Sequence, residues 1–140
     1  MKSEDLINLY KMTNQFGRTI NMEYFLNEEG IMVNCILIND IHLATPNVAH
    51  GGVISALADS TLGLAALKES AEHGNLVSTV EFKINYLKPA KLGDKITGIP
   101  RVRKIGRSII FVEADFLNQK DELIATASGT FNQYPASKVF

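Results

Sequence analysis

The stretch NVAHGGVISALADSTLGLAAL, residues 47–67, determines how this chain folds. A short polar loop and a double glycine precede a long run of small and apolar residues that contains no proline. Apolar side chains recur in it at helical spacings over much of the surface, so the run predicts a largely buried helix that begins near Gly51. Lys68 and Glu69 mark its hydrophilic end, and Gly74 follows as a stop signal.

One charged side chain, Asp59, lies inside this apolar run. Burying an unpaired carboxylate costs free energy, and such residues are often placed for chemistry. Ser55 lies four residues earlier and therefore shares its helical face. A structural role, in which Asp59 only accepts hydrogen bonds, is the alternative, and composition alone favours it.

The start of the predicted helix offers a second chemical group. The N–H of Gly51 has no partner inside the helix, and this end carries partial positive charge that suits an oxyanion. Gly51 and Asp59 are eight residues apart, which is roughly 12 Å along a helix axis. One helix cannot bring both groups to one reacting carbon, so a joint role predicts a site shared between two subunits.

The composition favours one domain over residues 1–140. The net charge of −1, with both signs interspersed, argues against a nucleic-acid binder. No apolar run has the length of a membrane span, and the start lacks a signal-peptide pattern, so we expect a cytoplasmic protein without a membrane partner. The single cysteine, Cys35, excludes an internal disulfide and is expected to be a buried apolar residue.

The rest of the chain predicts mainly strands. An N-terminal helical segment, residues 1–17, begins with Ser3 as a helix cap and ends at Gly17. Alternating or apolar runs predict strands at 22–26, 31–38, 77–87, 95–105, 107–117 and 122–132. Residues 133–140 have no period and are expected to form an irregular tail that ends in Phe140. One helix against antiparallel strands is an α+β layout, with the helix covering one face of the sheet.

Several motifs together resemble one family. The pieces are His-Gly-Gly followed after six residues by Asp59, the segment from Asn85 to Asp94, the turn Gly106-Arg107-Ser108, and the segment from Ala125 to Phe131. In this order they are similar to the hotdog-fold acyl-CoA thioesterases of the PaaI type, over about residues 20 to 132. The resemblance implies a central helix wrapped by a curved antiparallel sheet, and a homodimer that pairs into a homotetramer.

The resemblance also implies hydrolysis of an acyl-CoA thioester to a free acid and coenzyme A. Asp59 would act as general base or nucleophile, Gly51 would bind the carbonyl oxygen, and His50 would position the thioester. Without the resemblance, His50 is better explained as a loop residue. Thr79 falls where relatives carry a hydroxyl. Simple alternation places it off the apolar face of its strand, which fits an interface site or plain exposure to solvent.

One position departs from the family pattern. The family commonly has Asn six residues before the histidine and Gly three before it, where this chain has Ala44 and Asn47. Either Asn47 supplies the polarising amide from a shifted loop, or that contact is missing. A missing contact favours a non-catalytic module that binds or senses acyl-CoA. A dehydratase or hydratase of acyl thioesters is a further alternative, but its signature is not seen.

Coenzyme A carries phosphates, so basic residues should gather near the site. The candidates are Arg103, Lys104 and Arg107 around one turn, with Lys88 and Lys91. Each of them alone also fits an ordinary charged turn. The scattered histidines do not have metal-ligand spacing, and His42 is expected in a surface loop. No cofactor is expected beyond coenzyme A as part of the substrate.

Overall fold

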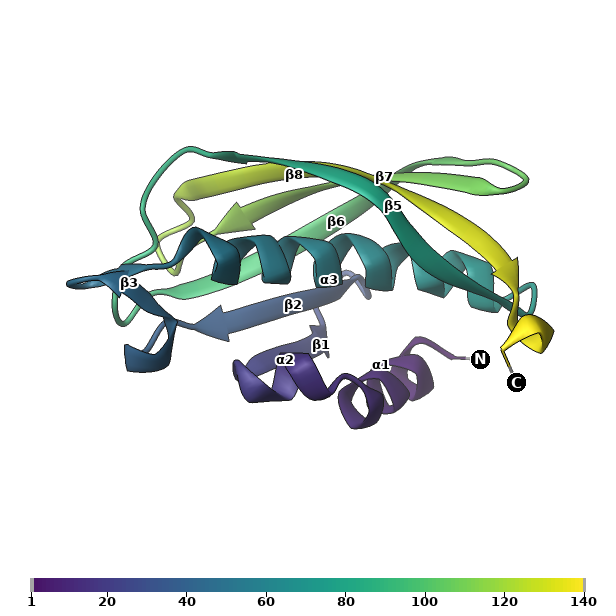
Figure 1. Ribbon diagram of the computed structural model, residues 1–140, viewed down its shortest axis with the longest axis horizontal. Helices are drawn as coiled ribbons and strands as arrows, with labels where there is room; N and C mark the ends of the chain where they lie inside the picture. The colour runs from purple at the N-terminus through teal and green to yellow at the C-terminus, as the bar shows by residue number, and fades with distance from the viewer. Residues whose placement is uncertain (1, 140) are drawn as a thin grey trace.

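The computed structural model describes residues 2–139, and the long helix α3 (Gly51–Ala71) lies at its centre. A curved antiparallel sheet encloses this helix (Figure 1). The strands, in spatial order, are β1 (Met22–Leu26), β2 (Met32–Leu37), β6 (Lys95–Ile105), β7 (Ile109–Leu117), β8 (Leu123–Pro135) and β5 (Asn75–Tyr86). The predicted α+β layout with a hotdog arrangement is confirmed, and β5 forms an open edge of the sheet.

Helix α3 is buried because its apolar residues meet those of the sheet. Leu57 and Leu62 are completely buried, and Phe116 and Phe131 of the sheet lie in the same core. The helix passes close to β6 at Gly98, where an added Cβ atom would clash with the Thr61 side chain of α3. A side chain there would push helix and sheet apart.

The smaller elements connect the strands or pack beside β1. They are α1 (Ser3–Thr13), α2 (Gln15–Thr19), the short strands β3 (Leu43–Thr45) and β4 (Val48–Ala49), and the 3₁₀ turns η1 (Asp40–His42) and η2 (Ala136–Lys138). In Figure 1, α1 and α2 lie on the side of α3 away from β7 and β8.

The predicted end of the N-terminal helix at Gly17 is wrong. Helix α1 already ends at Thr13, and the Asn14 side chain accepts a hydrogen bond from the Gly17 N–H at 3.0 Å to start α2. Gly17 is buried inside α2 next to the Tyr24 hydroxyl, where a larger residue does not fit. Ser3 is the first residue of α1 and not its cap.

The predicted start of the irregular tail, at residue 133, is also wrong. Strand β8 runs through Pro135, because residues 75–79 of β5 pair with it up to that point. Turn η2 follows, and Phe140 lies outside the described residues.

Strand β5 contains a bulge that changes which side chains face the helix. The pairing with β8 shifts between Thr79 and Glu81, so Val80 has no partner and is 58% exposed. Thr79 pairs with Phe131, and Phe82 pairs with Gly129. Phe131 and Gly129 are two residues apart in β8 and lie on one face of the sheet, so Thr79 and Phe82 share that face as well. The expectation that Thr79 lies off the apolar face is wrong, because simple alternation ignores the extra residue.

Candidate active site

The start of α3 presents backbone donors. His50 is the N-cap residue, and its Nδ1 accepts a hydrogen bond from the Gly52 N–H at 2.7 Å. Within residues 2–139 the Gly51 N–H has no acceptor, as expected for the first position of a helix. This donor, at the positive end of the helix dipole, can bind a developing oxyanion.

Tyr86 at the end of β5 ties the edge strand to this helix start. Its hydroxyl donates to the Gly51 carbonyl at 2.8 Å and is also hydrogen-bonded to the Ser55 hydroxyl. The sequence did not predict this role, because the alternation of side chains along the strand indicates only the face on which Tyr86 lies and not its hydrogen-bond partners. The contact fixes the position of Gly51 relative to the open edge of the sheet.

Two turns further along α3, Asp59 receives a hydrogen bond from β5. The Thr79 hydroxyl donates to Asp59 Oδ1 at 2.8 Å, and the bulge at Val80 gives Thr79 this orientation. Asp59 is half-buried, and no donor from residues 2–139 reaches its Oδ2. The structure thus brings two predicted site residues together and leaves the second carboxylate oxygen without a donor among the described residues.

Gly51 and Asp59 line different cavities of one protomer. A cavity of about 320 Å³ adjoins Gly51, and its further lining residues are Val48, Ala49, Ile54, Tyr86, Leu87, Lys88, Pro89, Ala90 and Ile124. A cavity of about 250 Å³ adjoins Asp59 and Thr79. The helix geometry alone predicts this separation.

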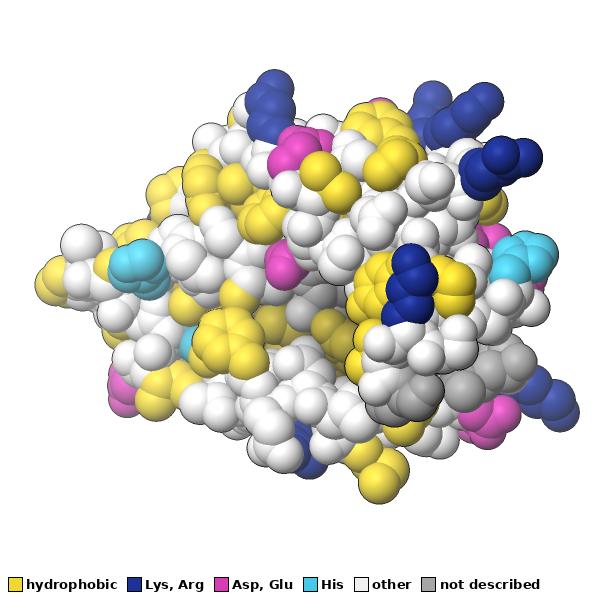
Figure 2. Space-filling model, turned by 45° about the vertical axis from the view of Figure 1, so that its right-hand side comes forward, with side chains coloured by type: hydrophobic (Ala, Val, Ile, Leu, Met, Phe, Trp, Pro, Cys, Tyr) yellow, Lys and Arg dark blue, Asp and Glu magenta, His cyan; other side chains and the backbone are white. Residues whose placement is uncertain are grey.

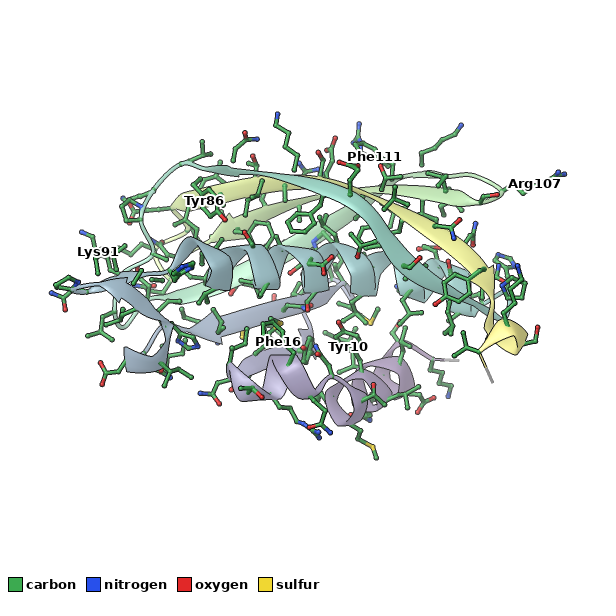
Figure 3. All side chains as sticks on the ribbon, in the orientation of Figure 1. Tyr10, Phe16, Tyr86, Lys91, Arg107 and Phe111 are labelled. Atoms are coloured by element: carbon green, nitrogen blue, oxygen red, sulfur yellow. The ribbon has the colours of Figure 1, made fainter. Side chains whose placement is uncertain are left out.

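The predicted coenzyme-binding residues form two groups at opposite ends of the molecule. Figure 3 shows Lys91 near the start of α3 and Arg107 at the far tip of the hairpin between β6 and β7. Arg103, near that tip, pairs with Glu113 at 3.8 Å. The two groups therefore cannot contact the same phosphate within one protomer.

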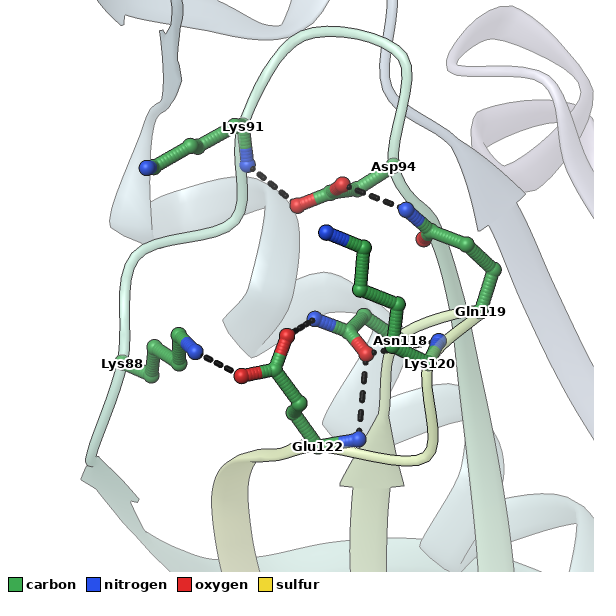
Figure 4. A network of polar contacts seen from close by, with 7 residues as sticks. All are labelled: Lys88, Lys91, Asp94, Asn118, Gln119, Lys120 and Glu122. Atoms are coloured by element: carbon green, nitrogen blue, oxygen red, sulfur yellow. Dashed lines mark hydrogen bonds and ion pairs between the residues drawn. The ribbon is translucent and has the colours of Figure 1, made fainter.

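Around Lys88 and Lys91 the loop after β5 meets the turn between β7 and β8 (Figure 4). Glu122 pairs with Lys88 and accepts a hydrogen bond from Asn118, and the Lys88 contact lowers the pKa of Glu122. Both oxygens of Asp94 are also occupied, by the Lys91 N–H and the Gln119 amide, each at 2.9 Å.

The carboxylates of this network are therefore already satisfied. The ammonium groups of Lys91 and Lys120 form no ion pair with any residue of the range 2–139. Both lysines line a cavity of about 210 Å³, and Lys88 is a further lining residue of it. Lys120 was missed by sequence reasoning because it lies in a turn far from the motif.

Asn47 lies in the tight turn between β3 and β4. Its φ of 65° and the preceding Pro46 match a type II turn, in which Asn or Gly is favoured at this position. Its side chain is exposed and makes no hydrogen bond to the described residues. The turn accounts for the residue type, and the role of its amide in positioning substrate stays a prediction. Ala44 is exposed on β3.

His42 is not in a surface loop, contrary to the prediction. It is 1% exposed, its Nδ1 accepts from the Asn39 N–H at 3.0 Å, and its Nε2 lies 2.6 Å from the Ile20 carbonyl oxygen. Both ring nitrogens are used to hold the η1 turn. Cys35 is buried as predicted, and burial raises the pKa of its thiol.

In residues 2–139 there is no cluster of three or more His, Cys, Asp or Glu side chains that could hold a metal. None of the helices in that range is long and apolar enough to cross a membrane.

Comparison with known proteins assigns the chain to a family. The model of the thioesterase superfamily matches residues 46–125. A putative esterase of Archaeoglobus fulgidus is 33% identical over 103 residues, which cover 74% of this chain and 64% of that protein. The chain thus matches less than two thirds of this relative's length.

Two solved structures share the fold. The Escherichia coli PaaI protein of the phenylacetic acid degradation operon superposes with a TM-score of 0.85 at 20% identity, covering 95% of this chain and 94% of that one. A Streptococcus mutans protein, solved with bound acetyl-CoA, superposes with a TM-score of 0.71 at 30% identity, covering 82% and 90%. The family match confirms the resemblance to the thioesterases, and the superposition on PaaI confirms the hotdog fold.

The cap contact of His50 predicts a stability effect that is separable from any chemical role. His50→Ala should lower the free energy of unfolding by about 1 kcal/mol, because the Gly52 N–H loses its acceptor. His50→Asn should retain most of that stability, because Asn is a good N-cap. Urea unfolding of both variants measures the difference, and equal losses would contradict the capping role.

Proposed function

Because the chain belongs to the thioesterase superfamily, we propose that it hydrolyses an acyl-CoA thioester to a free acid and coenzyme A. The observation that carries this proposal is the Asp59 carboxylate, held through one oxygen by Thr79 at the edge of a mainly apolar cavity. The acetyl-CoA in the Streptococcus mutans structure supports the choice of coenzyme A thioesters.

Two groups share the chemistry. The Gly51 N–H polarises the thioester carbonyl and stabilises the negative oxygen that forms on attack. Asp59 Oδ2 either takes a proton from the attacking water or attacks the carbonyl carbon itself to form a mixed anhydride that water then hydrolyses. In both routes the C–S bond breaks, and the coenzyme leaves as a thiolate that takes up a proton.

The site is shared between two subunits in this proposal. Gly52, Ser55, Ala56, Asp59 and Gly63 are incompletely buried and follow one side of α3, so a second α3 can approach closely. A two-fold axis near Ser55, midway between Gly51 and Asp59, would place each Gly51 opposite the partner's carboxylate. The open edge of β5 supports such a dimer, because two such edges can pair in antiparallel fashion. The tetramer implied by the resemblance stays a prediction.

The coenzyme lies along a groove that begins at Gly51. The apolar cavity beside Gly51 and the polar cavity beside Lys91 share Lys88 and Pro89, so they adjoin. The apolar part suits the pantetheine arm. The ammonium groups of Lys91 and Lys120, which form no ion pair among the described residues, suit the phosphates. Arg107, at the far tip of the hairpin between β6 and β7, lies too far from this groove to serve the same protomer. Arg103 and Lys104 belong to the end of β6 next to that tip.

A non-catalytic module that binds acyl-CoA is the second candidate. Ala44 favours it, because the family's polarising amide is absent at this position. Such a module would bind the thioester in the same groove without releasing a thiol.

Asp59→Asn should reduce thiol release from acyl-CoA by about a hundredfold or more, because the amide cannot act as base or nucleophile. The substitution keeps the shape and can still accept the Thr79 hydrogen bond, so the melting temperature should change little. Glu69→Gln on the same helix is the control and should retain full activity. Binding of acyl-CoA by the wild type without any thiol release would instead establish the second candidate.

Gly51→Pro should remove the proposed oxyanion donor while keeping the helix. Proline is well tolerated at the first helical position, and His50 already has the extended conformation (φ −60°, ψ 136°) that precedes proline. We expect kcat to fall by roughly 10² to 10³. Gly51→Ala retains the N–H, and its Cβ would lie at an ordinary 3.5 Å from Tyr86. Similar losses of kcat in both variants would rule out the donor role.

Lys91→Glu and Lys120→Glu should each raise the KM for acyl-CoA by about tenfold, because each removes a charged contact to phosphate. The KM for the matching N-acetylcysteamine thioester, which lacks the nucleotide, should not change. Arg107→Glu is the charge-matched control. A rise in KM for acyl-CoA in Arg107→Glu alone would place the phosphates at the other end of the molecule.

A further inference from the structure

We propose that Tyr86 is a positioning residue, whose hydroxyl group holds the Gly51 N–H at the place where the oxyanion forms. The inference rests on the proposed thioester hydrolysis and adds a residue that controls the reaction through another group. Tyr86 itself transfers no proton and binds no charge of the substrate in this role. It acts only through the start of α3.

The start of α3 is a weak part of the helix. Gly51 and Gly52 have no side chains, and both are exposed. The next two residues, Val53 and Ile54, are β-branched. Glycine loses the most conformational freedom when a helix forms, and β-branched residues are poor helix formers. Figure 2 shows the end of the molecule that carries β3 as a narrow projection with a histidine side chain at its surface, so few other elements surround the helix start.

Tyr86 holds this first turn in two ways. Its hydroxyl donates to the Gly51 carbonyl at 2.8 Å and is hydrogen-bonded to the hydroxyl of Ser55, one turn further along. Its ring lies against the glycine, since a Cβ atom added at Gly51 would be 3.5 Å from the ring carbon Cζ. Figure 3 shows Tyr86 between the end of β5 and the start of α3. One side chain thus fixes both ends of the first helical turn.

The backbone of Tyr86 is itself anchored in the sheet, although its side chain is 52% exposed. Tyr86 pairs with Ala125 of β8, which is completely buried. The N–H groups of Leu87 and Lys88 both donate to the Ile124 carbonyl, at 2.9 and 3.1 Å. The Tyr86 hydroxyl therefore ties the helix start to the sheet by hydrogen bonds and not by burial.

The chain just before the helix is held separately. The His50 N–H donates to the carbonyl of the buried His42 at 2.7 Å. The peptide group that carries the Gly51 N–H thus lies between an anchor at His50 and a second anchor at Tyr86. An oxyanion donor lowers the barrier only where it points at the developing charge, and a displacement of about 1 Å can cost about a hundredfold in rate. Loss of the Tyr86 hydroxyl should therefore slow the chemical step.

A double-mutant cycle between Tyr86→Phe and Gly51→Pro tests this role. Tyr86→Phe keeps the ring that lines the cavity, so kcat should fall about tenfold while the KM for acyl-CoA changes by less than about twofold. In Gly51→Pro, which has no N–H to position, the same substitution should cause no further loss. Ser55→Ala removes one partner of the hydroxyl and should give a smaller loss that also disappears in Gly51→Pro, which keeps the test valid if Tyr86→Phe does not fold.

Asn85→Ala is the matched control. Asn85 is the neighbour of Tyr86 in β5, its side chain lies on the opposite face, and it donates to the Thr126 hydroxyl at 3.4 Å. Its substitution also removes one side-chain hydrogen bond of β5, but none to the helix start, so kcat should not change.

Backbone order measured by ¹⁵N NMR relaxation separates this inference from the proposed reaction. In Tyr86→Phe the order parameters of the Gly51 and Gly52 amides should fall below the value of about 0.85 that is typical of rigid backbone, and Asn85→Ala should leave them unchanged. Unchanged order parameters in Tyr86→Phe, or losses of kcat that multiply in the double variant, would overturn the positioning role even if the wild type hydrolyses thioesters. A wild type that releases no thiol, together with lower order parameters in Tyr86→Phe, would overturn only the hydrolysis.

Discussion

The fixed rise of an α-helix is the constraint on which the rest of this structure depends. It holds the Gly51 N–H and the Asp59 carboxylate roughly 12 Å apart along α3. Each group is then fixed by the same edge strand, Gly51 through the Tyr86 hydroxyl and Asp59 through the Thr79 hydroxyl. The two groups of the proposed chemistry are therefore held separately, and neither can move along the helix to meet the other.

The sheet leaves one side of α3 open, and the separation between Gly51 and Asp59 lies along that side. A carboxylate in a fully enclosed helix would lose the solvation that keeps it charged, so Asp59 lies on the incompletely covered side, facing a cavity. Small residues on that side and the unpaired edge of β5 suit a second copy of the chain. In the proposed dimer, the open edge and the reactive carboxylate become parts of one interface.

Much of the fold could be predicted from the sequence, because α3 is long, apolar and bounded by clear signals. Features that depend on a single residue or on tertiary contacts could not be predicted from it. The bulge at Val80 has no local signature, and it reverses the face of Thr79. His42 resembles a loop residue in the sequence, but its ring is buried by a carbonyl contact to Ile20, far away in the chain. Lys120 joins Lys91 only because two loops meet in space.

The shared site is the central claim, and mixing two inactive variants tests it most directly. Asp59→Asn and Gly51→Pro subunits, co-expressed with different tags, form dimers of which about half are mixed, and each mixed dimer holds one intact site of two. Thiol release should return to about a quarter of the wild-type rate in the unfractionated mixture, because only those mixed dimers are active. If mixed dimers form and remain as inactive as the parent variants, both groups act within one protomer and the shared site is wrong.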